Sequence, residues 1–291
     1  MAQTRAAHVQ ASQSGDSHQE KRRIKVVFFD FMGTCLDWHG GVVDALPRTI
    51  PEPVRSAMAL HWRQEFFREL HARSTQGLAP EDIDVTHRKT LLRILQQGEA
   101  YGEQRRHFVG LDGSTTSAPA DDGGPTDVPS IEEAVRAWHE MAPWPDVPPA
   151  LAALKKEDLG LELFVLSNGT TRLQLDLVRS AGLGHVFSML FSSELLGVYK
   201  PAPEAYEKAL GLVRARPDEA VMVAAHAYDL RAARKLGMRT VYVCRWTDDT
   251  TEDMDVVRKE NDAFLGEEEK GMQGLPTAVV ALGRALQSLP G

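Results

Sequence analysis

Short apolar runs recur along this chain with helical patterns between them, and this alternation constrains the fold more than any other feature. A continuous apolar run of roughly four to eight residues suits a strand buried on both faces of a parallel sheet. The stretches Thr171 to Ser180, Pro203 to Val213 and Asp229 to Leu236 carry helical patterning, and Gly237 follows the last of them as is typical just past a helix end. We therefore predict an α/β fold with a Rossmann-like, doubly wound parallel sheet. The predicted strands are Ile24 to Phe29, Leu161 to Leu166, Ser188 to Phe191, Ala220 to Ala224 and Thr240 to Val243.

The interval between the first two predicted strands is too long for a single crossover connection. Residues 39–143 carry helical patterning, notably Val54 to Arg73 and Ile83 to Gln97. We predict that residues 39–143 form an inserted α-helical cap over the active edge of the sheet. Within it, Gly110 to Pro129 is rich in turn-forming residues, which predicts a mobile loop near 110–129.

Residues 24–38 and 144–291 would then make up the sheet-containing core. Residues 1–23 are polar, which predicts a disordered N-terminal tail. A polar, acidic stretch, Asp248 to Gln273, leads into a predicted closing helix around Ala278 to Leu286.

The composition excludes several classes of function. The chain has 291 residues, of which 43% are hydrophobic and 25% charged, as in ordinary globular proteins. A net charge of −8 argues against nucleic-acid binding, although a local basic pocket for a small anionic substrate remains compatible with it. No apolar stretch approaches the roughly 20 residues of a membrane span. The two cysteines, Cys35 and Cys244, are too few for a disulfide framework and favour a reducing, cytoplasmic location.

Polar side chains follow four successive predicted strands. Asp30 follows the first strand, Ser167 and Asn168 the second, Lys200 the third, and His226 with Asp229 the fourth. Because ligands of open parallel sheets bind beyond the carboxyl ends of the strands, we predict that these residues share an active site.

Asp30 closes an apolar run, and Met32 lies two places after it. A carboxylate at the end of a buried strand can act as a nucleophile and form an ester that water later cleaves. The position of Met32 is suited to an acid that protonates an alkoxide leaving group, but methionine cannot donate a proton. A halide leaves as an anion and needs no such acid. Asp30 and Met32 together therefore favour a reaction with an aspartate nucleophile but without the leaving-group acid of a phosphatase.

Four segments, in this order and at these spacings, resemble the haloacid dehalogenase superfamily, specifically its type II 2-haloacid dehalogenase branch. The cap adds a fifth segment that resembles the substrate-binding arginine region of the dehalogenases. The segments are Phe29-Asp30-Phe31-Met32-Gly33-Thr34-Cys35-Leu36-Asp37, Leu166-Ser167-Asn168-Gly169, Val198-Tyr199-Lys200-Pro201 with Tyr206, Ala224-Ala225-His226-Ala227-Tyr228-Asp229, and Trp62-Arg63-Gln64.

The resemblance implies Asp30 as the nucleophile, Lys200 as the cation that holds it ionised, and Asp229 as the group that orients or activates water. Thr34 and Ser167 would hydrogen-bond the carboxylates of the nucleophile and the substrate. Each of these residues also has a purely structural interpretation, such as an aspartate that caps a turn or a hydroxyl that caps a helix.

The resemblance further implies three substrate-binding residues. Arg63 would clamp a carboxylate or halide, although it lies in a helical pattern where it could equally pack its stem. Asn168, at a predicted helix start, would favour a bound carboxylate or simply cap that helix. Tyr206 would donate to the charged cluster or to the substrate, or serve as a helix-face aromatic.

The chain departs from the family at Ala224 and His226, where characterised dehalogenases usually have a serine and an asparagine. The alanine removes one donor from the lysine–aspartate network. A histidine can exchange protons near neutral pH, and we hypothesise that His226 cooperates with Asp229 on the hydrolytic water.

Magnesium prefers oxygen ligands, and phosphatases of the superfamily hold it with carboxylates. Ala225-His226 replaces the Gly-Asp pair common in the phosphatase motif, and Met32 offers no oxygen. We therefore predict no metal and no other cofactor.

The function implied is hydrolysis of a small 2-haloalkanoic acid to a 2-hydroxy acid and halide through an aspartyl ester. Two alternatives stay open: a phosphohydrolase of the same fold, and a catalytically weak binding protein on the same scaffold. The resemblance also implies a homodimer.

Overall fold

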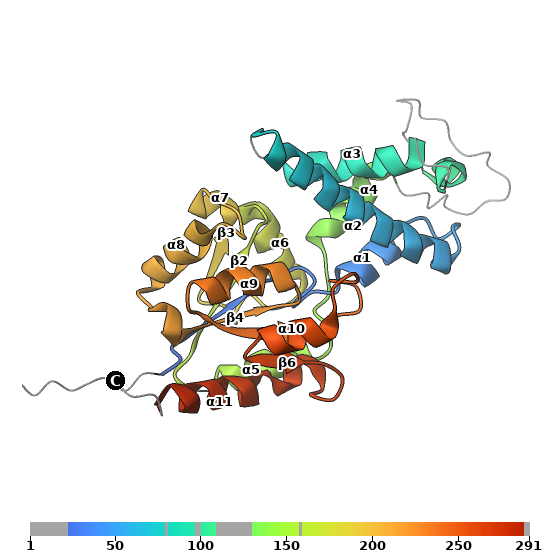
Figure 1. Cartoon of the computed structure of the whole chain (residues 1–291). Helices are drawn as coiled ribbons and strands as arrows, with labels where there is room; N and C mark the ends of the chain where they lie inside the picture. The colour runs from blue at the N-terminus through green and yellow to red at the C-terminus, as the bar shows by residue number, and fades with distance from the viewer. Residues whose placement is uncertain (1–22, 79–80, 97–99, 109–129, 157–158, 288–291) are drawn as a thin grey trace, which may run out of the picture.

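The structure is a computed structural model that describes residues 23–78, 81–96, 100–108, 130–156 and 159–287. A six-stranded parallel sheet has the order β3-β2-β1-β4-β5-β6, so β1 lies between β2 and β4. This arrangement confirms the predicted fold class, a doubly wound parallel sheet with helices on both faces (Figure 1). The strands are β1 (Val26–Phe29), β2 (Glu162–Ser167), β3 (Met189–Ser192), β4 (Ala220–Ala224), β5 (Arg239–Val243) and β6 (Ala263–Leu265).

Alternate residues of β1 face the two sides of the sheet, as the pleat of a strand requires. Val27 and Phe29 belong to one apolar cluster, which includes side chains of α5 (Val147–Leu154), α6 (Thr171–Ser180) and α11 (Leu275–Gln287). Val26 and Phe28 belong to another cluster. The second cluster includes side chains of α8 (Pro203–Val213), α9 (Ala227–Lys235) and α10 (Met254–Glu260), and a short helix, α7 (Ser193–Leu196), follows β3.

A set of helices, called here the helical insertion, lies between β1 and β2 in the chain and stands beside the sheet in space (Figure 1). The predicted helical patterning of this region is thus confirmed, whereas its division from the core as a separate domain stays a prediction. The predicted loop near 110–129 lies outside the described ranges, and so does the predicted tail except for Arg23. The insertion comprises α1 (Trp38–Ala45), α2 (Glu52–Thr75), α3 (Ile83–Gln96), η1 (Gly102–His107), α4 (Ile131–Arg136) and η2 (Ala137–His139).

The insertion and one face of the sheet share a continuous apolar cluster. Phe29 and Phe31 at the end of β1 belong to the same cluster as Trp38, Trp62 and Trp138 of the insertion, and all five side chains are fully buried. Burial of such large side chains stabilises by roughly 1.5–3 kcal/mol each, so this packing holds the insertion against the carboxyl edge of the sheet.

The sequence prediction missed part of the C-terminal region. The stretch Asp248 to Gln273, for which the sequence analysis identified only a polar, acidic character, contains α10 and the edge strand β6, which pairs with β5. Only three residues form β6, too few for an apolar alternation to be visible in the sequence. None of the described helices has the length and apolarity needed to cross a membrane.

Candidate active site

Asp30 follows β1 directly, where a tight turn brings its carboxylate to the edge of the sheet. The backbone N–H of Asp30 donates to Val223 O (3.0 Å), which extends the β1–β4 ladder by one residue. Gly33 then adopts φ +87°, and a Cβ at this position would meet the Asp248 carboxylate oxygens at 2.8 Å. Glycine is required here both for the left-handed conformation and for the close approach of Asp248.

Three donors surround the carboxylate of Asp30, a residue that is only 7% exposed to solvent. Thr34 Oγ1 (2.8 Å) and His226 Nδ1 (3.0 Å) contact Oδ2, and Lys200 Nζ donates to Oδ1 (2.9 Å). Burial by itself would raise the pKa of Asp30, but the charges of Lys200 and His226 outweigh it and hold that pKa well below its usual range. The carboxylate is therefore ionised at neutral pH.

Lys200 joins two carboxylates. Its ammonium contacts Asp30 and also Asp229 Oδ2, while Tyr206 donates to Asp229 Oδ1. Burial disfavours the ammonium, yet Asp229 and Asp30 raise the pKa of Lys200 above its ordinary value. Burial raises the pKa of Asp229, and the opposing effect of the Lys200 charge is too small to cancel this rise. The structure thus places Lys200, Asp229 and Tyr206 in one hydrogen-bonded cluster with Asp30.

Asn168 and Ser167 follow β2, but their described contacts are internal. The Asn168 amide donates from Nδ2 to Lys200 O (2.8 Å) and accepts at Oδ1 from Lys200 N (2.7 Å). Ser167 Oγ accepts from Gly169 N (3.3 Å). Asn168 therefore fixes the main chain of Lys200, a role that the sequence analysis did not assign to it.

Arg63 extends from α2 toward the same edge of the sheet and is buried. Its guanidinium lies 4.5 Å from the Trp38 ring centroid, contacts Met32 Sδ (3.1 Å), and pairs loosely with Asp248 Oδ1 (3.4 Å). The helical insertion therefore contributes a cation to this edge of the sheet, and in this structure that cation faces Asp248. The role of Arg63 as a clamp for a carboxylate or halide stays a prediction.

Asp248 is a site residue that sequence reasoning missed. It accepts from Trp38 Nε1 (3.1 Å) and Thr247 Oγ1 (2.7 Å), and its Oδ1 lies 3.1 Å from His226 Nε2. Burial would raise the pKa of Asp248, but His226 and Arg63 lower it below its ordinary value. The signal that could have found it is the rule already used for the other strands, since Asp248 lies a few residues beyond the end of β5.

His226 lies between the two carboxylates. Its ring nitrogens contact Asp30 Oδ2 and Asp248 Oδ1 at 3.0 and 3.1 Å. Burial opposes protonation, but Asp30 and Asp248 raise the pKa of His226 to about 10. The ring is therefore an imidazolium at neutral pH. Its side chain faces the nucleophile, and no contact within the described part of the chain joins it to the Asp229 side chain.

The cluster does not suit a divalent cation. Each of the four oxygens of Asp30 and Asp229 already accepts from Lys200, Thr34, His226 or Tyr206, whereas magnesium would need several of them as ligands. Across the described ranges, no group of three or more His, Cys, Asp or Glu side chains is arranged to hold a metal ion. The arrangement instead neutralises three carboxylates with the cations of Lys200, His226 and Arg63.

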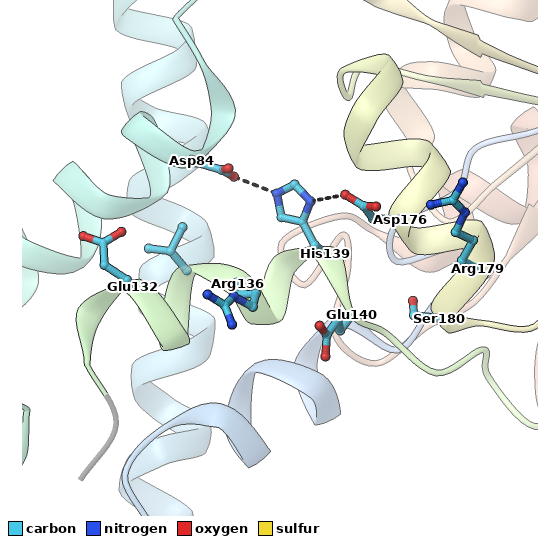
Figure 2. Close-up of a pocket in the computed structure, with 9 residues that line it drawn as sticks. Asp84, Glu132, Arg136, His139, Glu140, Asp176, Arg179 and Ser180 are labelled. Atoms are coloured by element: carbon cyan, nitrogen blue, oxygen red, sulfur yellow. Dashed lines mark hydrogen bonds and ion pairs between the residues drawn. The ribbon is translucent and has the colours of Figure 1, made fainter.

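A surface groove of about 830 Å³ lies elsewhere, along α4, η2 and α6 (Figure 2). His139 in this groove bridges Asp84 of α3 (2.8 Å) and Asp176 of α6 (3.0 Å), as the dashed lines of Figure 2 show. None of the residues that line it belongs to the Asp30 cluster, so the groove marks a contact between the insertion and the core and is separate from the chemistry.

A buried, ionised aspartate follows the central strand and is held by a lysine that also binds a second aspartate, an arrangement that suits a hydrolase working through a covalent ester. The haloacid dehalogenase-like hydrolase family model matches residues 24–237, and the chain belongs to that family.

Three known proteins illustrate the relationship. The (S)-2-haloacid dehalogenase of Pseudomonas sp. (strain YL) is 31% identical, over 76% of this chain and 83% of that protein. The phosphoserine phosphatase of Thermus thermophilus is 36% identical, but over only 42% of this chain and 49% of that protein. The crystal structure of the L-2-haloacid dehalogenase PA0810 is 29% identical, covers 89% of this chain and 99% of its own, and superposes with a TM-score of 0.65.

Proposed function

We propose that the protein is a hydrolytic dehalogenase that converts a small 2-haloalkanoic acid to a 2-hydroxy acid and halide through an ester of Asp30. The observation that carries this proposal is the Asp30 carboxylate itself, ionised by Lys200 and His226, with Met32 at the position where a leaving-group acid would be needed. Family membership and the dehalogenase relatives support the same reaction class.

In the first step Asp30 attacks the halogen-bearing carbon with inversion, and the halide departs with the bonding electrons. Oδ1 is the freer nucleophilic oxygen, because it meets Lys200 alone whereas Oδ2 meets both Thr34 and His226. The buried position of Asp30 excludes bulk water, which strengthens each charge interaction during this step.

We propose that the substrate carboxylate binds to Arg63, to the Ser167 hydroxyl and to the main chain of Asn168, because the Asn168 side chain is already engaged by the Lys200 main chain. Arg63 can accept this carboxylate by exchanging its 3.4 Å contact with Asp248, which is longer than a good ion pair. Ser167 and Asn168 stand at the carboxyl end of β2, which pairs with β1 at the edge of the sheet from which Asp30 projects. The helical insertion acts in this proposal as a cap over the bound acid.

In the second step water attacks Cγ of the esterified Asp30. Asp229 orients this water and takes its proton, a role suited to a carboxylate whose pKa burial has raised. Lys200, held at its main chain by Asn168, stabilises the charges of Asp30 and Asp229.

A phosphohydrolase is the second candidate, because a phosphatase matches part of the chain. Two observations count against it. Met32 Sδ receives a contact from Arg63 and offers no proton, and Lys200 lies where a cation would bridge the carboxylates. A weak binding protein on the same scaffold is disfavoured because the Asp30–Lys200–Asp229 network is complete.

The expected setting is a cytoplasmic enzyme that needs no metal or cofactor and forms a homodimer. Light scattering at several protein concentrations measures the mass in solution, and a homodimer should have twice the chain's 32.1 kDa.

The test of the reaction is halide release from haloacetates and 2-halopropionates in EDTA, with Asp30→Asn as the matched control. Release by the wild type and none by the variant supports the proposal. No halide release from any of these acids, together with Mg²⁺-dependent phosphate release from phosphomonoesters, would show that the protein is a phosphohydrolase instead.

A further inference from the structure

His226 is a doubly anchored cation at the nucleophile. Ionised carboxylates only accept hydrogen bonds, so a ring that meets Asp30 on one side and Asp248 on the other donates from both nitrogens. His226 is also the N-cap residue of α9, but its side chain makes no capping hydrogen bond. Both ring nitrogens are therefore available for these contacts.

The two donors on Asp30 Oδ2 resemble an oxyanion hole. Thr34 Oγ1 and His226 Nδ1 contact Oδ2 at 2.8 and 3.0 Å, and Ala225 N donates to Thr34 Oγ1 (2.8 Å), which orients that hydroxyl toward Asp30. Once Oδ1 carries the substrate carbon, Oδ2 is the carbonyl oxygen that gains negative charge when water attacks. Donors aimed at such an oxygen are among the largest contributions to catalysis.

Esterification creates a difficulty for this arrangement, because it removes the Asp30 charge that helps to keep His226 protonated. The other charged groups near the ring are Lys200 beside Asp30 and Arg63 beside Asp248, both of which oppose a second positive charge. Tyr228, whose ring centroid lies 5.7 Å away, is an uncharged phenol at neutral pH, and the Asp249 carboxylate is engaged by Ala227 N. The direct anionic contact that remains is Asp248.

We propose that Asp248 is a positioning residue that keeps His226 cationic through the ester stage, so that His226 and Thr34 together stabilise the oxyanion formed by water attack. This inference rests on the proposed dehalogenase reaction. It assigns His226 a donor's role at Asp30, in place of the proton exchange with water that the sequence suggested.

The steps balance with His226 protonated throughout. Oδ1 bonds to the substrate carbon as halide leaves with the C–X electrons. Water then bonds to Cγ and gives a proton to Asp229, while the carbonyl π electrons move to Oδ2. Collapse breaks the Cγ–Oδ1 bond, the alkoxide takes the proton from Asp229, and the new Asp30 carboxyl group releases its proton to solvent, which gives 2-hydroxy acid, halide and one proton overall.

The first test needs no substrate. Asp30→Asn replaces the carboxylate by a neutral group of the same shape and so mimics the charge of the ester, and ¹⁵N NMR of labelled histidine, assigned with His226→Asn, reports the ionisation of His226. We expect His226 to stay protonated at neutral pH in Asp30→Asn and to titrate roughly 1–3 pH units lower in Asp30→Asn/Asp248→Asn. Titration at the same pH in both variants would overturn the proposal.

The second test follows one turnover of bromoacetate by bromide release and by the mass of the Asp30 peptide. Asp248→Asn should release bromide in a burst as the wild type does, but its ester should hydrolyse roughly 10²-fold more slowly. Lower pH should restore the proton on His226, so the hydrolysis rate of the variant should then approach that of the wild type. The matched control is Asp249→Asn, which removes the adjacent carboxylate and should hydrolyse the ester at the wild-type rate.

Ester hydrolysis in Asp248→Asn at the wild-type rate, or a slowing that pH does not relieve, would overturn the proposal. Absence of bromide release from the wild-type enzyme would instead reject the dehalogenase reaction, and the NMR comparison would still decide what Asp248 does to His226.

Discussion

The Asn168 side chain binds both main-chain polar groups of Lys200, donating to its carbonyl oxygen at 2.8 Å and accepting from its N–H at 2.7 Å. Ser193 Oγ in turn donates to Asn168 O (2.8 Å), so the segments after β2 and β3 form one connected unit. This pairing sets the origin of the lysine side chain, whose ammonium must reach two carboxylates at once.

Asn168→Ala should therefore lower kcat rather than raise KM. The variant loses two hydrogen bonds to the Lys200 main chain, and a shift of about 1 Å in a catalytic group can cost roughly 10²-fold in rate. Steady-state kinetics with bromoacetate measure both constants. A large rise in KM with kcat unchanged would show that Asn168 binds the substrate directly instead.

Lys200→Met should abolish turnover and destabilise the fold. It leaves Asp30 and Asp229 buried without their shared cation, and removal of one partner of a buried ion pair costs roughly 3–5 kcal/mol. Urea unfolding measures this loss. Adding Asp229→Asn to the variant should restore part of the stability without activity, and a double variant as unstable as Lys200→Met would contradict the electrostatic explanation.

His226 makes stability depend on pH in the alkaline range. Because its folded-state pKa is raised to about 10 from an ordinary 6.5, its contribution is fully present below pH 6.5 and is lost as pH rises through about 10. The difference in unfolding free energy between wild type and His226→Asn should shrink across that window by a few kcal/mol. The exposed His185, changed to Asn, serves as the control, and a gap for His226→Asn that does not vary with pH would contradict the prediction.

His87→Phe should stabilise the helical insertion. The imidazole is fully buried between the rings of Phe66 and Trp138, each 4.0 Å away between centroids, and among the described residues neither of its nitrogens has a hydrogen-bond partner. An unsatisfied buried polar group costs roughly 1–3 kcal/mol, and burial lowers the pKa of His87 well below its usual range, so no charge is lost. A melting temperature at or below that of the wild type would show that the imidazole has a partner or a role that these contacts do not explain.

The strands β1 and β4 were predictable from sequence because both of their faces are buried, which produces continuous apolar runs such as Val26–Phe29. The helices Thr171–Ser180 and Pro203–Val213 begin and end where their patterns predicted. The edge strand Ala263–Leu265 was missed because only its last residue is fully buried, so tertiary pairing with β5 rather than local pattern defines it.

The site was predictable where a residue directly follows its strand, as for Asp30 and His226. Asp248 was missed because it lies beyond the turn after β5, in a segment that Arg245 anchors by donating to Thr34 O at 3.1 Å. Contacts of this kind join residues more than 200 positions apart and leave no local pattern. The direction in which Asn168 points was unpredictable because its partner, the main chain of Lys200, lies 32 positions further along the chain and beyond β3.

The covalent role of Asp30 is tested most directly by a single turnover of bromoacetate with excess enzyme in water labelled with ¹⁸O. If water attacks Cγ of an aspartyl ester, the product takes its oxygen from Asp30, and the heavy oxygen appears in the peptide that contains Asp30. Mass spectrometry should therefore find an unlabelled glycolate and a labelled Asp30 peptide. A labelled glycolate with an unlabelled peptide would show that water displaces the halide itself, and the account of Asp30 as nucleophile would be wrong.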